Sequence, residues 1–143
     1  MSHRAKLIVD AITNKITGLP TTGQNVEQSR VWAVTRAPAL TVRLGPMVQT
    51  SDLNQLIDQT LTIYIDIHVK AHETRIDDDV LQIHQELWQA IKVHHDLGLD
   101  YVIDTSLTEL SEPILNGESD QPTAKATLTI EVRFRHAVTH PGA

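Results

Sequence analysis

Strict alternation of apolar and polar side chains in two segments constrains the fold more than any other feature of the sequence. Over residues 61–69, apolar side chains fill every second position and polar ones fill the positions between them. Residues 123–137 repeat the pattern, with apolar positions at Ala124, Ala126, Leu128, Ile130, Val132 and Phe134. Successive side chains of an extended chain point to opposite faces, so a period of two is typical of a strand with one buried face. Both segments therefore predict long strands of a sheet that is covered on one face.

Two further segments carry apolar residues at spacings of three and four, the period of an amphipathic helix. The first covers 3–17, and its apolar stripe is Leu7, Ile8, Ala11, Ile12 and Ile16. The second covers 75–95, and its stripe of Val80, Ile83, Leu87 and Ile91 is flanked by Leu81 and Trp88. Thr74 and Asp77 have the spacing of a capping box, and Gly18 and Gly98 are typical helix stops. We predict a helix over each segment.

Shorter strands and turns complete the predicted fold. Weaker alternation covers 26–34, 39–44 and 101–107. Asn116-Gly117 is typical of a tight hairpin turn before the last strand, although Glu118-Ser119-Asp120 suggests a longer loop. Segment 45–54 is polar and contains Gly45-Pro46, so we expect a long loop or hairpin tip there. One apolar face per strand and two amphipathic helices predict an α+β two-layer sandwich. Its mostly antiparallel or mixed β-sheet carries both helices on one face.

Length and composition limit the class of protein. A chain of 143 residues suffices for one domain, and we expect a single domain over 1–143 with a loose tail over 138–143. Twelve Lys and Arg stand against 18 Asp and Glu, and the net charge of −6 argues against a protein that grips nucleic acid through its whole surface. The absence of cysteine excludes disulfides, cysteine-ligated metals and a thiol nucleophile. The first apolar run is short, so we expect no signal peptide, no membrane span and a cytoplasmic chain.

The residue types that carry catalysis or hold metals show no recognisable pattern. His68 and His72 are four residues apart, but they lie at the end of a predicted strand, where that spacing does not converge on one ion. Residues 77–79 are three aspartates, which spread around a helix start and are explained by the helix macrodipole. No nucleophile elbow, P-loop or dinucleotide-binding glycine pattern occurs. We therefore predict no catalytic residue, no metal site and no cofactor.

Two features fit a protein that works by assembling with others. Trp32 and Tyr64 fall on the strand faces opposite the apolar ones, and exposed aromatic residues are the usual anchors of protein interfaces. Segment 45–54 places Met47 and Val48 among polar residues, where they are candidates for apolar anchors that become ordered on docking. The predicted interface residues are Trp32, Arg43, Met47, Val48, Gln49, Asp52 and Tyr64.

The order of elements and several local motifs resemble one protein family. A helix leads into Thr-Gly-Leu-Pro-Thr-Thr-Gly-Gln-Asn-Val at 17–26, followed by a strand and a second strand preceded by proline. Further similarity lies in the strand 61–69, the helix 76–91 after its acidic start, Glu112-Pro113, and Ala-x-Leu-x-Ile-x-Val-x-Phe at 126–134. With this pattern the chain resembles the tail terminator (tail completion, minor tail U-like) proteins of long-tailed bacteriophages.

That resemblance implies a structural virion protein and not an enzyme. Members form a ring, usually of six subunits, that caps the growing tail tube, stops its polymerisation and offers a surface for joining the head. The implied partners are copies of the chain itself, the tail tube protein and a head-completion or connector protein. The implied location is the tail or neck of the virion, assembled in the host cytoplasm. A negative net charge suits a ring through which DNA passes without specific binding.

Two alternatives stay open at this point. The first is a head–tail connector or head-completion adaptor of the same neck, since such proteins share length and element order. The second belongs to a different class: a small metal-binding or ligand-binding enzyme domain that uses Asp66, His68 and His72. A monomer with bound metal would favour that enzyme domain, whereas self-assembly favours a structural ring.

Overall fold

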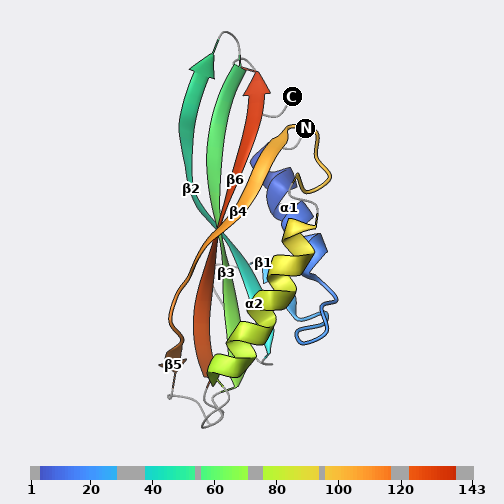
Figure 1. The fold of residues 1–143 in the computed structure, drawn as a ribbon, viewed down its shortest axis with the longest axis vertical. Helices are drawn as coiled ribbons and strands as arrows, with labels where there is room; N and C mark the ends of the chain where they lie inside the picture. Colours follow the sequence, from blue (N-terminus) through green and yellow to red (C-terminus); the bar gives the residue numbers. More distant parts are fainter. Residues whose placement is uncertain are drawn as a thin grey trace.

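In the part of the chain that the structure describes, six β-strands form one sheet and two α-helices lie against one of its faces (Figure 1). The computed structural model describes residues 4–28, 38–53, 56–70, 76–93, 96–116 and 123–137. In chain order the elements are α1 (Arg4–Ile16), β1 (Val26–Gln28), β2 (Ala39–Leu53), β3 (Leu56–Lys70), α2 (Ile76–Lys92), β4 (Val102–Leu110), β5 (Ile114–Asn116) and β6 (Thr123–Ala137). The predicted α+β two-layer sandwich is confirmed.

The sheet is mixed, with strand order β1-β2-β3-β6-β4. The β1–β2 pair is parallel, and all the other pairs between described strands are antiparallel. The two strands predicted from the strongest alternation, β3 and β6, are neighbours at the centre of the sheet. The short β5 pairs with the start of β6, as the hairpin prediction requires, although Gly117 itself lies outside the described residues.

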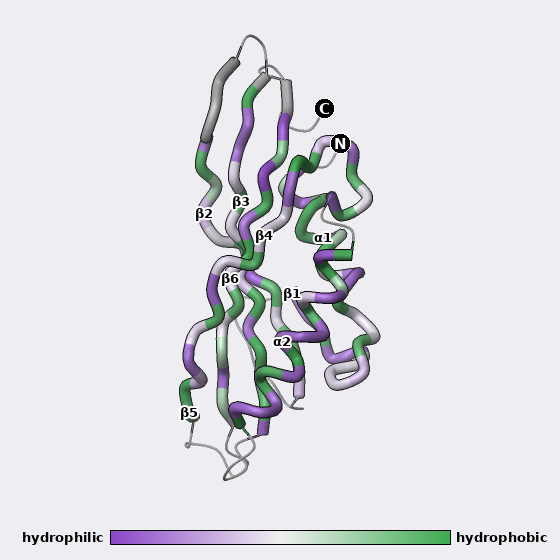
Figure 2. The backbone as a smooth tube through the Cα atoms, viewed as in Figure 1, coloured by the Kyte–Doolittle hydropathy of each residue, from purple (hydrophilic) through white to green (hydrophobic). Residues whose placement is uncertain are grey.

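The core lies between the sheet and the helices, and the predicted apolar stripes fill it. The apolar positions of 61–69 and 124–134 are at most 1% exposed. On the helices, Ile8, Ile12 and Ile16 of α1 and Val80, Ile83, Leu87 and Ile91 of α2 are buried against them. Figure 2 shows hydrophobic residues alternating with hydrophilic ones along the central strands. The two-residue and 3.6-residue periods therefore identified most of the core, but on α1 the predicted Leu7 is 38% exposed and the unpredicted Val9 is buried.

The prediction of a loop over 45–54 is wrong, because β2 continues as a strand to Leu53 and pairs with β3. Two register shifts, between Leu44 and Met47 and between Gln49 and Ser51, absorb the residues that do not fit the ladder. Pro46 lies within the first of these register shifts. Beyond Val42, no described strand pairs with the outer side of β2, so the N–H that proline lacks removes no hydrogen bond between described strands. The ends of β2, β3 and β6 extend past α1 in Figure 1, and we call residues 44–53, 56–60 and 133–137 the arm.

Gly45 is required where β2 crosses close to β3. A Cβ atom at this position would lie 2.8 Å from the carbonyl oxygen of Thr62 and 2.8 Å from Cε2 of Tyr64. Contacts of that length are not tolerated, and one of them is to backbone, so a side chain here forces the two strands apart. Gly45 therefore marks the start of the arm, which neither polarity nor turn propensity reveals.

The helix bounds differ slightly from those predicted. Helix α1 falls within 3–17, whereas α2 ends at Lys92 instead of reaching 95, and the chain then turns through Leu97 and Gly98 at positive φ. The three aspartates 77–79 occupy the first turn of α2 as predicted. The proposed cap Thr74, the histidines 94 and 95, and the tail 138–143 lie outside the described residues. Among the helices described, none is long and apolar enough to cross a membrane.

The Gly-Leu-Pro-Thr-Thr-Gly turn at 18–23 is anchored to α2 by a buried carboxylate. Glu86 accepts hydrogen bonds from the backbone N–H of Thr21 at 2.9 Å and from its hydroxyl at 2.5 Å, and Gln82 donates to it at 2.9 Å. Burial raises the pKa of Glu86, but the hydrogen bonds from Thr21 and Gln82 outweigh it and leave the pKa below its ordinary value. Glu86 therefore stays ionised and holds together the turn and helix.

Candidate interface on the sheet

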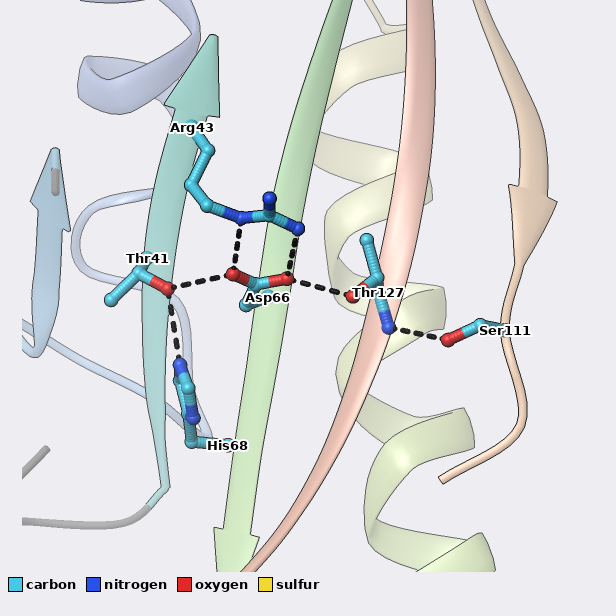
Figure 3. Close-up of polar contacts among 6 residues, drawn as sticks. All are labelled: Thr41, Arg43, Asp66, His68, Ser111 and Thr127. Carbon is cyan, nitrogen blue, oxygen red and sulfur yellow. Dashed lines mark hydrogen bonds and ion pairs between the residues drawn. The ribbon is translucent and has the colours of Figure 1, made fainter. Parts of the chain in front are cut away.

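Asp66 is the centre of a polar cluster on the sheet face opposite α2 (Figure 3). Arg43 donates to both carboxylate oxygens, from Nε at 2.6 Å and from a terminal nitrogen at 3.0 Å. The Thr127 hydroxyl donates to Asp66 at 2.7 Å. These groups come from the three neighbouring strands β2, β3 and β6, so the cluster ties the middle of the sheet together.

Further hydroxyl and imidazole groups extend the cluster on both sides. The Thr41 hydroxyl lies 3.4 Å from Oδ2 of Asp66 and 3.0 Å from Nε2 of His68. At the other end, the backbone N–H of Thr127 donates to the Ser111 hydroxyl at 2.8 Å. Thr41, Asp66 and His68 are each at most 3% exposed. Buried polar groups need partners, and this network provides them for the central carboxylate.

The electrostatics of the cluster favour a charged Asp66 beside a neutral His68. Burial raises the pKa of Asp66, but the hydrogen bonds from Arg43 and Thr127 and the positive charge of Arg43 bring the pKa below its ordinary value. The same hydrogen bond raises the pKa of the Arg43 guanidinium. Burial lowers the pKa of His68, against the attraction of Asp66 and together with the repulsion of Lys125.

This balance predicts a loss of stability as the pH falls. A histidine whose pKa is lower in the folded chain than about 6.5 contributes stability above that value and loses it as the pH drops towards the folded pKa. We therefore expect the free energy of unfolding to fall between pH 7.5 and 5.5 by more in the wild type than in His68→Gln, which has no titrating ring. Urea unfolding at several pH values measures both slopes, and equal slopes would contradict this assignment.

The structure brings together two of the predicted interface residues, Arg43 and Tyr64. The Arg43 guanidinium lies over the Tyr64 ring, 4.9 Å from its centroid, while it also forms the ion pair with Asp66. Tyr64 also packs against Gly45. Arg43 is thus largely committed to contacts inside the molecule, and Tyr64 supports the start of the arm. The predicted interface residue Trp32 lies outside the described residues.

Met47, Val48 and Gln49 are exposed and lie along the outer edge of the sheet. Met47 pairs with Leu61 and shares the helix-facing side, whereas Val48 pairs with Thr60 and points to the opposite side. Their exposed fractions are 42% for Met47 and 57% for Val48. Asp52 belongs to the same strand and pairs through its backbone with Ile57. An edge strand with exposed apolar side chains is a surface onto which another chain can add a strand.

Several other apolar side chains are exposed, which the alternation of residues did not predict. Leu44 is 45% exposed, although its partner in register, Ile63, is fully buried. Ile114 and Leu115 of β5 are 63% and 65% exposed, and Leu81 and Trp88 of α2 are 58% and 51% exposed. Ile114 and Leu115 are adjacent apolar residues that follow Pro113 and do not belong to an alternating pattern. This is a weak sequence signal that the pair is exposed.

The rival enzyme site is partly assembled. Asp66 and His68 belong to one cluster, bridged by Thr41, but His72 lies outside the described residues. Within the described ranges, no group of three or more His, Cys, Asp or Glu side chains is placed to hold a metal ion. No protein-family model matches this chain, and no curated protein matches it significantly. The chemistry of the described cluster is that of structural charge pairing.

Proposed function

We propose that this chain is a structural protein of a bacteriophage tail or neck, which forms a ring, caps the tail tube and ends its polymerisation. The proposal rests on the resemblance in the order of elements and in the turn at 17–26. One structural observation supports it further: the outer edge of β2 exposes Met47 and Val48 on a strand that, among the described elements, only β1 partly covers.

An exposed apolar edge strand supports a role in assembly because it is costly for a protein that works alone. Unpaired backbone N–H and C=O groups together with apolar side chains promote association, and monomeric proteins usually protect such edges with charges or short strands. From Gly45 to Gln49 this edge has no charged side chain, so only Pro46 and the two register shifts limit the pairing of another strand. A neighbouring subunit or the tube end can pair with the backbone and bury Met47 and Val48.

Head-to-tail contacts of this kind are also what a ring requires. Identical subunits that contact each other through two different surfaces form a closed ring when the rotation between them closes. The edge of β2 is one such surface, and its partner is a different surface of the next subunit. A head-completion adaptor of the same neck would use the same edge and differ in its position within the virion.

The experiment that tests this function compares the wild type with Met47→Lys/Val48→Lys. We expect negative-stain images of the wild-type protein mixed with tail tubes of the phage that encodes it to show rings at the tube ends. Two added charges on the edge should abolish both ring formation and capping, since a lysine ammonium without a partner cannot be buried against a neighbouring subunit.

Ile114→Lys is the matched control, because Ile114 is also an exposed apolar residue on a strand but lies on β5. It should cap tubes as well as the wild type does. Wild-type protein that never locates at tube ends would refute the proposed function. A double lysine variant that caps tubes normally would instead refute the role of the β2 edge.

A further inference from the structure

The outward face of α2 differs from an ordinary solvent-exposed helix face. Between Asp79 and Lys92 the exposed residues are Leu81, Gln82, Gln85, Trp88 and Gln89, and none of them is charged. Trp88 is 51% exposed and Leu81 is 58% exposed. Depletion of charge around an exposed tryptophan is the composition of the centre of a protein interface. The face is separate from the edge of β2 and is not used by the function proposed above.

The spacing along this face is that of a helix–helix seam. Asp78, Leu81, Gln85, Trp88 and Lys92 follow one another at intervals of three, four, three and four residues. Residues at these intervals form one stripe on a helix and are the positions that pack against a partner helix. The buried stripe of Val80, Ile83, Leu87 and Ile91 already faces the sheet. The second stripe is exposed from Asp78 to Trp88, and at its end the half-buried Lys92 reaches the carbonyl of Thr105 in β4.

The charges at the two ends of the stripe identify its partner. The stripe begins with Asp78 and ends with Lys92, and both pairs, Asp78 with Lys92 and Leu81 with Trp88, are centred on residues 84–85. A second copy of α2 lying antiparallel, with a two-fold axis near Gln85, places each Asp78 near Lys92 of the other copy and each Leu81 near the other Trp88. A parallel arrangement would place like charges together.

We propose that α2 is a homodimerisation surface, on which two copies of this chain pair antiparallel through Leu81 and Trp88 about a two-fold axis at Gln85. Antiparallel pairing also opposes the two helix macrodipoles. Lys92 donates one hydrogen bond to the carbonyl of Thr105 at 2.8 Å and retains further N–H donors for Asp78 of the second copy. The contact area of one helix pair is small, so the dimer is weak in dilute solution.

A single engineered cysteine gives a direct test because the chain contains none. Two copies related by the proposed axis bring residue 85 next to itself, so Gln85→Cys should form a disulfide-linked dimer under mild oxidation at high protein concentration. Asn14→Cys is the matched control, since Asn14 is an exposed polar residue of α1. It should remain monomeric on a non-reducing gel. Equal cross-linking of the two variants would refute the surface.

Charge reversal tests the orientation. In the Gln85→Cys background, Asp78→Lys and Lys92→Glu should each reduce cross-linking about threefold to tenfold, as expected for two lost surface ion pairs. Mixing the two variants should restore it, because in the mixed dimer the new lysine at position 78 meets the new glutamate at position 92, and Asp78 meets Lys92. Circular dichroism checks that both variants are folded. Failure of the mixture to recover would exclude the antiparallel two-fold contact.

A third substitution separates this surface from ring assembly. Trp88→Glu should lower Gln85→Cys cross-linking about tenfold or more, as expected for the loss of an aromatic anchor, and leave the capping of tail tubes unchanged. Met47→Lys/Val48→Lys should do the reverse, abolishing capping and leaving the cross-link intact. If Trp88→Glu cross-links as efficiently as its parent, the α2 surface is not a site of dimerisation.

Discussion

Replacing Asp66 by alanine is expected to lower the free energy of unfolding by about 3 kcal/mol, the lower end of the range for breaking a buried ion pair. The carboxylate is almost fully buried and is bound by Arg43, Thr127 and Thr41, so its loss leaves the Arg43 guanidinium and the Thr127 hydroxyl without their acceptor. The lower end applies because the Arg43 side chain is 27% exposed and regains some hydration. Urea unfolding followed by circular dichroism measures the change.

A double variant tests whether the stability lost in Asp66→Ala comes from leaving Arg43 buried without its partner or from losing the ion pair itself. Asp66→Leu combined with Arg43→Met removes both charges, and such replacements of buried ion pairs are often neutral or stabilising. We expect it to recover most of the stability lost in Asp66→Ala. Asp10→Ala serves as the control, because Asp10 pairs with Lys6 on the surface of α1 and should cost less than about 1 kcal/mol. If Asp66→Ala costs no more than Asp10→Ala, the cluster does not stabilise the sheet.

Phe134→Ala is expected to destabilise the fold more than Asp66→Ala does, by about 3–5 kcal/mol. The ring is fully buried, and its strand lies between β3 and β4, where Gln59 and Val102 are its partners in register. Removal of the ring leaves a cavity at the base of the arm that rigid strands on both sides cannot fill. Thermal unfolding should therefore show a markedly lower melting temperature.

Phe134→Leu and Val48→Ala are the control variants for that measurement. Leucine keeps most of the apolar volume, so we expect a loss of about 1 kcal/mol. Val48 is exposed, and its truncation should change the stability by less than about 0.5 kcal/mol. A change for Phe134→Ala within the range of Val48→Ala would show that β6 does not contribute to the core at this point.

The fold was predictable where a single period governs a segment. Every apolar position of β6 from Ala124 to Phe134 and the stripe of α2 were identified correctly, because burial on one face leaves a regular record in the sequence. The arm was not predictable in this way. Gly45 and Pro46 suggest a turn when taken alone, and only the closeness of Tyr64 and the register shifts show that a glycine and a proline fit within an edge strand.

The candidate interface was predictable only in part. Met47 and Val48 stood out as apolar residues in a polar segment, and they are exposed, although on a strand and not in a loop. The alternation places Arg43 and Tyr64 on the face opposite the apolar residues, but it does not reveal that they contact each other and that Asp66 holds Arg43. The pattern of residues along one strand does not show which charged side chains lie next to it on the neighbouring strands.

The central position of β6 has a consequence for biosynthesis. This strand is synthesised after the other described strands, yet it occupies the place between β3 and β4, with pairs as distant in sequence as Leu56 and Ala137. Until the ribosome releases β6, the nascent chain contains the long hairpin of β2 and β3, and the apolar strand β3 lacks its neighbour β6. Such nascent chains are prone to aggregate. Chains truncated before Thr123 should therefore accumulate as inclusion bodies.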